Sequence, residues 1–197
     1  MKIMVADTET GGLDTTKHSV LSLGALVGDL DTGEVIESFE TLIKLPSIND
    51  YIVTAKALEI NKLSVAQCFK DGMSPSDAVA KLSDLYINNG CQLVGGHNFD
   101  YDIEMISYQL MESTPSEFKR LFTYRKVDTC NLIQLFVGNI ASGASLSKTI
   151  EALNIDVSDI KGSYHGALFD SMCSFRIMHR FRKVLNDPAV IAKLQNA

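Results

Sequence analysis

The stretch Val5-Ala6-Asp7-Thr8-Glu9-Thr10-Gly11-Gly12-Leu13 places two carboxylates where an apolar strand runs into a glycine turn. Residues 2–6 are mostly apolar, as expected of a central strand that is covered on both faces. Because side chains at i and i+2 of a strand point to the same side, Asp7 and Glu9 share a face. Like charges this close repel each other, so a divalent cation with oxygen ligands is the simplest explanation. A strand end with solvated acids is the alternative, since D-x-E alone is a weak motif.

Length and composition indicate one domain that covers residues 1–197. Hydrophobic residues make up 46% of the chain and charged residues 21%, and this hydrophobic fraction is sufficient to form a full core. The N-terminus enters the strand directly, without a charged and apolar leader, and no apolar run of about 18 residues is present. We therefore expect a cytoplasmic protein that does not cross a membrane.

The cysteines and the net charge narrow the function classes further. Cys68, Cys91, Cys130 and Cys173 show no C-x-x-C spacing, which favours reduced thiols over a disulfide framework or a zinc site. The formal charge of -6 argues against a protein that coats nucleic acid through a broad basic field. Local contact with one strand remains open, because acids gathered at a cation lower the net charge while the bound ion reverses the local field.

The order of the predicted elements indicates an α/β fold. Strands are expected at 20–30 and 35–44, around a turn that contains Asp-Thr-Gly, then at 92–96 and 123–127. Helices are expected at 54–58, from Ser74 to 88, from Asp100 to about 110, and at 129–136, 146–153, 167–184 and after Pro188, with a small-residue loop at 138–144. This order predicts a mixed central sheet of about five strands, an antiparallel meander joined to parallel crossovers, with flanking helices.

A second acidic segment runs from His97 to Asp102. On a helix, Asp102 shares its face with Met105 and Ile106, so it points inward near a helix N-terminus. Asp100 lies about 200° away around the helix and is expected to cap it. Asp102 is either a metal ligand or only an acid that the helix dipole favours. Asp128 is similarly expected to cap the helix that begins at 129.

A third segment, Tyr164-His165-Gly166-Ala167-Leu168-Phe169-Asp170, combines a histidine with an acid. Five residues on one helix separate two side chains by roughly 140°, so His165 meets Asp170 only from a loop before the helix. Gly162 and Gly166 permit such a loop. A histidine there can take a proton from water near neutral pH. The alternative is an ordinary surface histidine.

Together these segments resemble a known enzyme family. D-x-E at 7–9, H-N-x-x-x-D at 97–102 and H-G-A-L-x-D at 165–170 are similar to the motifs of the DEDDh, or DnaQ-like, 3'-to-5' exonucleases. That family includes the proofreading epsilon subunit of bacterial DNA polymerase III and ribonuclease T. The resemblance spans residues 2–182, and weaker similarities support it at 10–13, 57–60 and 128–129.

The resemblance implies a ribonuclease H-like fold and a two-metal site for Mg²⁺ or Mn²⁺. Asp7, Glu9, Asp102 and Asp170 would bind the metals, with Asp7 as the bridging ligand, and His165 would act as the base. The implied reaction is hydrolysis of phosphodiester bonds at the 3' end of single-stranded nucleic acid, with DNA favoured over RNA and nucleoside 5'-monophosphates as products. Two divalent ions suit this in-line displacement, since they stabilise both the attacking and the leaving oxygen.

The resemblance also implies residues that hold the terminal nucleotide: Thr10, Gly11, Leu13, Leu58, Asn98 and Phe99. The family often has threonine at the position of Gly11 and alanine or serine at that of Phe99, so the choice of substrate stays open. The implied partner is a 3' single-stranded end, with a DNA polymerase as a second candidate. Two other functions compete: an inactive nucleic-acid-binding or polymerase-docking module of the same fold, and a metal phosphoesterase for small molecules.

Overall fold

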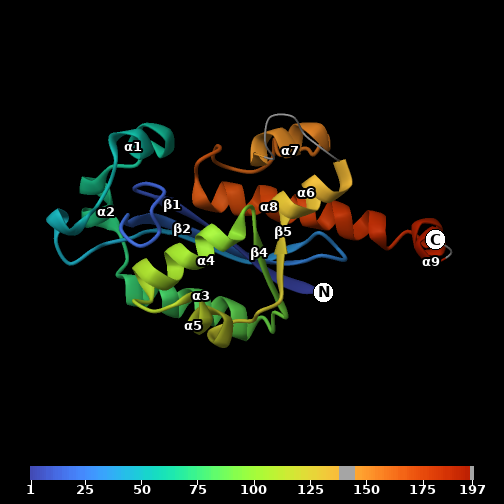
Figure 1. Ribbon diagram of the computed structural model, residues 1–197, viewed down its shortest axis with the longest axis horizontal. Helices are drawn as coiled ribbons and strands as arrows, with labels where there is room; N and C mark the ends of the chain where they lie inside the picture. The colour runs from blue at the N-terminus through green and yellow to red at the C-terminus, as the bar shows by residue number, and fades with distance from the viewer. Residues whose placement is uncertain (138–144, 196–197) are drawn as a thin grey trace.

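A five-stranded mixed sheet in the order β3-β2-β1-β4-β5 forms the centre of the molecule. The computed structural model describes residues 1–137 and 145–195. Strands β1 (Lys2–Thr10), β2 (Val20–Asp29) and β3 (Val35–Leu42) form an antiparallel meander. Strands β4 (Leu93–Gly96) and β5 (Lys126–Asp128) add in parallel beside β1. This confirms the predicted α/β fold, with the acid-bearing strand in the middle of the sheet (Figure 1).

Helices occupy most of the remaining described chain. They are α1 (Ala55–Asn61), α2 (Val65–Asp71), α3 (Pro75–Asn88), α4 (Phe99–Met105), α5 (Pro115–Leu121), α6 (Thr129–Val137), α7 (Leu146–Ala152), α8 (Ala167–Leu185) and α9 (Pro188–Gln195). A 3₁₀ turn covers Ile48–Asp50, and a π-helical turn, Ile106–Leu110, extends α4. The sequence did not predict α2 or α5. The loop expected at 138–144 lies outside the described residues.

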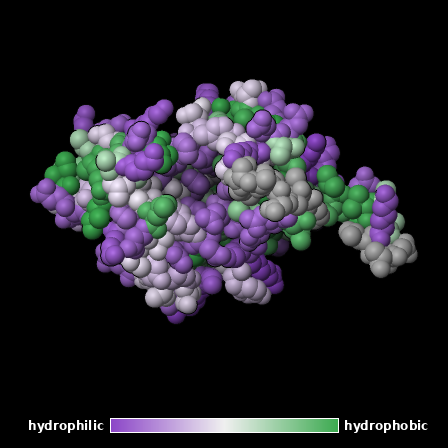
Figure 2. Space-filling model, turned by 45° about the horizontal axis from the view of Figure 1, so that its top comes forward, coloured by the Kyte–Doolittle hydropathy of each residue, from purple (hydrophilic) through white to green (hydrophobic). Residues whose placement is uncertain are grey.

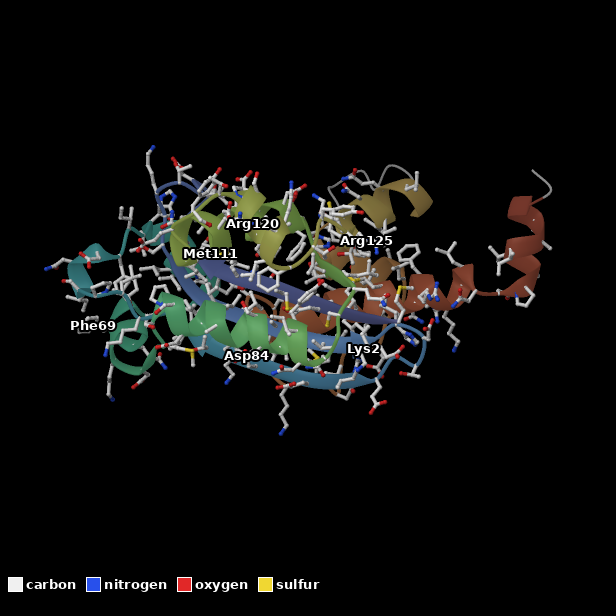
Figure 3. All side chains as sticks on the ribbon, turned by 90° about the horizontal axis from the view of Figure 1, so that it is seen from below. Lys2, Phe69, Asp84, Met111, Arg120 and Arg125 are labelled. Atoms are coloured by element: carbon white, nitrogen blue, oxygen red, sulfur yellow. The ribbon has the colours of Figure 1, made fainter. Side chains whose placement is uncertain are left out.

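The two faces of the sheet carry separate hydrophobic cores. On one face, Met4 and Ala6 of β1 pack in a cluster with residues of α3, α4 and α5. On the other face, Ile3 and Val5 pack with Phe175 and other residues of α8. Outside these layers, Asp84 of α3 and Arg120 of α5 are exposed to solvent (Figure 3). The alternation along β1 therefore follows the two-residue period of a strand covered on both sides.

Helix α8 crosses β2 closely at Gly24. A Cβ atom on Gly24 would lie 2.2 Å from the backbone nitrogen of Leu168 and 2.3 Å from the carbonyl carbon of Ala167. Ser171 Oγ also donates a hydrogen bond of 3.1 Å to the Gly24 carbonyl oxygen. The missing side chain thus brings the first turn of α8 against the sheet beside Asp7, which pairs with Gly24 across the strands.

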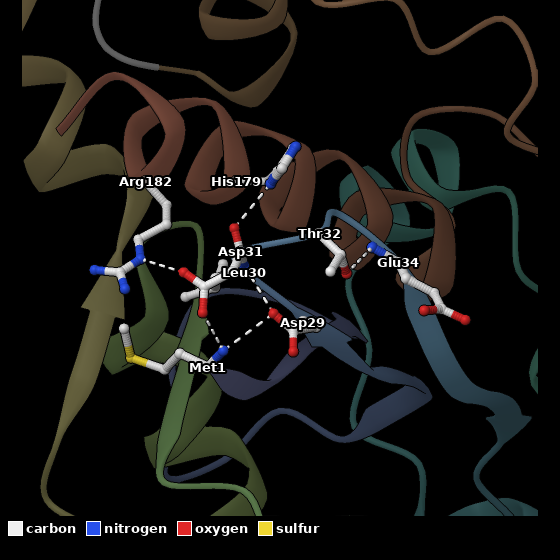
Figure 4. A network of polar contacts seen from close by, with 8 residues as sticks. All are labelled: Met1, Asp29, Leu30, Asp31, Thr32, Glu34, His179 and Arg182. Atoms are coloured by element: carbon white, nitrogen blue, oxygen red, sulfur yellow. Dashed lines mark hydrogen bonds and ion pairs between the residues drawn. The ribbon is translucent and has the colours of Figure 1, made fainter. Parts of the chain in front are cut away.

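Polar contacts hold the other end of α8 to the turn between β2 and β3 (Figure 4). Arg182 Nε lies 2.8 Å from Asp31 Oδ1, and His179 Nδ1 lies 2.8 Å from the Leu30 carbonyl oxygen. Asp31 also pairs with the Met1 ammonium at 2.5 Å, and Asp29 pairs with the same ammonium at 3.0 Å. Exposed ion pairs contribute little free energy each. The contacts of Arg182 and His179 join α8 to this turn at the end of the helix away from the candidate site.

Candidate active site

One cleft of about 620 Å³ brings together the acids and the histidine that the sequence singled out. Asp7, Glu9, Asp102, His165 and Asp170 all line it. Asp7 and Glu9 lie on the face of β1 that α8 covers, because they continue the row of Ile3 and Val5. The cleft is thus built from the strand and from the helices on both of its faces.

The remaining site residues come from helix starts. Asp102 lies in the first turn of α4 and is 3% exposed, and Asp170 lies in the first turn of α8 and is 9% exposed. His165 belongs to the loop before α8, as predicted, and has a left-handed backbone with φ of 67°. Its backbone N–H donates a 3.2 Å hydrogen bond to Asp170 Oδ2. This bond keeps the exposed imidazole and the buried carboxylate on the same side of the cleft.

The carboxylates are electrostatically unfavourable to one another. Burial, together with the charges of Asp102, Asp170 and Glu9, raises the pKa of Asp7 well above its usual value. Burial and neighbouring carboxylates raise the pKa of Glu9 to about 8. Burial also raises the pKa of Asp102 to about 7 and that of Asp170 to about 6. A divalent cation would relieve both the repulsion and the loss of hydration.

The side chains fit such a cation. One donor atom each from Glu9, His165 and Asp170 lie within 4.8 Å of one another. Asp170 Oδ1 is buried and has no hydrogen-bond partner, so it is available as a ligand. Carboxylate oxygens are the ligands that Mg²⁺ prefers. This group of donors includes His165, for which the sequence predicts only the role of a base.

The start of α4 differs from the prediction. Asp100 does not cap the helix: it pairs with Lys126 of β5, while the N–H groups of Asn98 and Phe99 each donate a 3.0 Å bond to Asp128. Asp128 Oδ1 also accepts a 2.9 Å bond from the N–H of Cys130 in α6. Helix α4 begins at Phe99 after Asn98 in a left-handed conformation, so Asp100 already lies inside it. The Asp128 carboxylate at the end of β5 thus accepts hydrogen bonds from the starts of both α4 and α6.

The predicted nucleotide-binding residues separate into two groups. Thr10 and Leu13 line the cleft, and Leu13 is 87% exposed. Phe99 is 0% exposed and packs edge-on against Phe118, so the prediction that its ring packs on a base is wrong. Leu58 packs in the cluster around Leu21, Gly11 is buried against the backbone of Ile52, and Asn98 turns the chain into α4. None of these four residues is among those that line the cleft in the described structure.

Several residues of the cleft were not predicted from the sequence. Tyr101 donates a 2.8 Å bond to the Gly12 carbonyl oxygen, and its hydroxyl lies 2.7 Å from Thr10 Oγ1. Asn61 of α1 donates a 3.1 Å bond to the Thr10 carbonyl oxygen. Both side chains fix the glycine turn, Tyr101 from an unspecified position within the second motif and Asn61 from outside the three motifs. The only sequence signal for Tyr101 was its place directly before Asp102, and Asn61 had none beyond being a polar residue at the end of a helix.

The walls of the cleft around Leu13 are largely apolar. Lys56, Ala57 and Ile60 of α1 also line the cleft, and Ile60 is 43% exposed. Figure 2 shows further hydrophobic surface at the end of the molecule that α1 and α2 form. His97 also lines the cleft, with Nδ1 2.8 Å from Thr129 Oγ1. The cleft thus combines a polar acidic floor with an apolar side suited to a flat ring system.

Comparison with solved structures identifies the fold. An E. coli exonuclease I structure in complex with a dT13 oligonucleotide matches with a TM-score of 0.74 at 16% identity, over 98% of this chain and 43% of that one. The zinc-bound form of an E. coli exonuclease I complex with single-stranded DNA matches with a TM-score of 0.74 at 16% identity, over 99% and 43%. Exonuclease I from Methylocaldum szegediense gives a TM-score of 0.74 at 17% identity, over 99% and 43%.

These likenesses establish a ribonuclease H-like fold. The chain spans less than half the length of the exonuclease I structures it matches. No curated protein matches the sequence. The model of the RNase T exonuclease family matches residues 4–178, a range that contains all residues of the cleft, from Asp7 to Asp170. The chain therefore belongs to the RNase T exonuclease family.

Proposed function

We propose that this protein is a DEDDh-type 3'-to-5' exonuclease that uses two Mg²⁺ or Mn²⁺ ions. It would hydrolyse single-stranded nucleic acid from the 3' end and release nucleoside 5'-monophosphates. The observation that carries the proposal is the convergence of four acids and His165 on one cleft. Solved relatives in this fold are complexes with dT13 and dA16 oligonucleotides, which supports single-stranded DNA as the favoured substrate.

The side chains would divide the work as follows. Asp7, Glu9, Asp102 and Asp170 would hold the cations, which when bound stabilise the attacking and leaving oxygens of an in-line displacement. His165 would take the proton of the attacking water at a ring nitrogen, a role that its exposed position on the loop permits. Leu13 and Ile60 would pack against the terminal base, and Tyr101 would hold the turn that carries Leu13.

The alternative of an inactive binding module is less consistent with the site. Burial raises the pKa of each acid of the cluster above its usual value, and repulsion from the other carboxylates adds to this at Asp7 and Glu9. These side chains therefore cost stability when no cation is present. A protein that only bound nucleic acid would gain nothing from that cost. A direct test separates the two functions.

We expect a 3'-labelled single-stranded DNA oligonucleotide to be shortened from its labelled end in Mg²⁺ or Mn²⁺, and excess chelator to abolish the reaction. Matched DNA and RNA oligonucleotides, run beside a generic phosphodiester, would measure the preference between them by gel analysis. A faster reaction on DNA than on RNA supports the proposed substrate. Full turnover in excess chelator would contradict metal dependence, and cleavage of the generic phosphodiester alone would favour a small-molecule phosphoesterase.

We also expect Mg²⁺ or Mn²⁺ to raise the melting temperature, and to raise it more at pH 8 than at pH 6. The pKa values of Glu9, Asp102 and Asp170 are raised on folding to about 8, 7 and 6, so the folded form binds more protons than the unfolded chain. The free energy of unfolding of the metal-free protein therefore falls as pH rises from roughly 4 to 8. Bound cations reduce this loss of stability, and they also stabilise the folded form by mass action.

The measurement is thermal unfolding with and without metal at both pH values. A buffer without divalent cations, brought to the same ionic strength with Na⁺, controls for screening of surface charge. An unchanged melting curve in saturating Mg²⁺ and Mn²⁺ at pH 8 would contradict a preformed cation site.

We also propose a cytoplasmic location and a protein partner. Within residues 1–137 and 145–195, no helix is long and apolar enough to cross a membrane. The four cysteines are free, as expected of reduced thiols, and this supports a cytoplasmic location. Docking to a DNA polymerase stays a prediction. Mixing the two purified proteins and testing whether they elute together in gel filtration would check it.

A further inference from the structure

Thr8 connects two of the sequence motifs through one carboxylate oxygen. It lies between Asp7 and Glu9 on β1 but points to the opposite face of the sheet, where α4 packs. Its backbone N–H donates a 2.9 Å hydrogen bond to Asp102 Oδ1, and its Oγ1 donates a second, of 2.7 Å, to the same oxygen. Both groups are buried, with Thr8 7% and Asp102 3% exposed.

The two bonds restrict how Asp102 can serve the cleft. Oδ1 accepts both donors, so Oδ2 is the oxygen that remains for the cleft that Asp102 lines. Two donors from one residue hold Oδ1, and with it the rotation of the carboxylate group, more firmly than one bond does. Since both donors are on β1, Asp102 is positioned relative to Asp7 and Glu9 by the strand that carries them.

We propose that Thr8 is a positioning residue that holds Asp102 by Oδ1 and directs Oδ2 to the cation site. The inference rests on the proposed function, in which Asp102 is a metal ligand. Groups that orient metal ligands typically change metal affinity by about 10 to 100-fold when they are removed. The backbone N–H bond does not depend on the side chain of residue 8, so the effect of losing only the hydroxyl lies at the lower end of that range.

The test is Mn²⁺ binding to the purified protein without substrate, followed by electron paramagnetic resonance of free Mn²⁺. Thr8→Val replaces the hydroxyl by a methyl group of similar size, and we expect the dissociation constant for Mn²⁺ to rise about 10-fold. Thr8→Ser keeps the hydroxyl and is expected to bind near the wild-type value. Thr149→Val is the matched control, because Thr149 is 0% exposed and its Oγ1 has no hydrogen-bond partner.

A double-mutant cycle with Asp102→Asn tests separately whether Thr8 acts through Asp102 and whether Asp102 binds the metal. If Thr8 acts through Asp102, Thr8→Val has no further effect on Mn²⁺ affinity in the Asp102→Asn background. Wild-type affinity in Thr8→Val, or additive effects in the cycle, would overturn the role of Thr8. Wild-type affinity in Asp102→Asn would instead contradict Asp102 as a ligand. Thr8→Ala, which adds no methyl group beside the carboxylate, replaces the valine variant if that variant does not fold.

Discussion

Asp102→Asn is expected to slow release of nucleotides by roughly 10² to 10⁴-fold, while Asp100→Asn leaves the rate near that of the wild type. The loss follows from a ligand charge worth several kcal/mol of transition-state stabilisation, at about 1.4 kcal/mol per tenfold. The asparagine introduced in place of Asp102 would still accept bonds from Thr8 through its amide oxygen, so the fold should persist. The measurement is the single-turnover rate on a 3'-labelled oligonucleotide in saturating Mn²⁺.

Asp100 is a close control because it is an aspartate on the same turn of α4. Its side chain faces away from the cleft and pairs with Lys126 on the surface, an interaction of small energetic weight. Melting curves of both variants show whether folding is intact. If Asp100→Asn is inactive while Asp102→Asn cuts normally, the assignment of the second acidic motif is wrong.

His165→Asn is expected to lower the rate by roughly 10² to 10⁴-fold, the usual contribution of a positioned general base. Asparagine is chosen over alanine because residue 165 has φ of 67°, and asparagine adopts the left-handed region more readily than other non-glycine residues. The substitution thus removes the base without adding backbone strain. Single-turnover rates and Mn²⁺ affinity are measured on the same preparation.

The affinity measurement distinguishes two roles of His165, since its donor atom lies within 4.8 Å of those of Glu9 and Asp170. A base affects the rate and leaves Mn²⁺ affinity unchanged, whereas a ligand affects both. Tyr164→Phe is the neighbouring control, because the ring that packs against Phe169 is kept. A His165→Asn enzyme with near wild-type rate would remove the imidazole from the mechanism.

Local periodicity explains why so much of the fold was predictable. The alternation along β1 placed Asp7 and Glu9 on one face, and the helical spacing after 100 placed Asp102 inward. The five-residue interval before Asp170 required His165 to lie on a loop, and it does. Each of these inferences depends only on geometry within one element or across one boundary, which the sequence specifies directly.

The wrong predictions concern contacts between distant segments. Phe99 is buried because Phe118 of α5 packs against it, and α5 was not recognised in the sequence. The cap of α4 comes from Asp128, about thirty residues later, while capping rules consider only the first few residues. Tyr101 and Asn61 likewise act on a turn that is distant in sequence. Contacts between segments that are distant in sequence leave no local pattern in the sequence.

The separation of the two cores means that the cleft depends on both layers of the fold. Asp170 and His165 reach the cleft only when α8 has packed on its face of the sheet, and Asp102 only when α4 has packed on the other. A folding intermediate with one layer unformed would lack at least one of the four acids. The complete cleft therefore requires both layers to be assembled, so the integrity of the site reports on the whole fold and not on either layer alone.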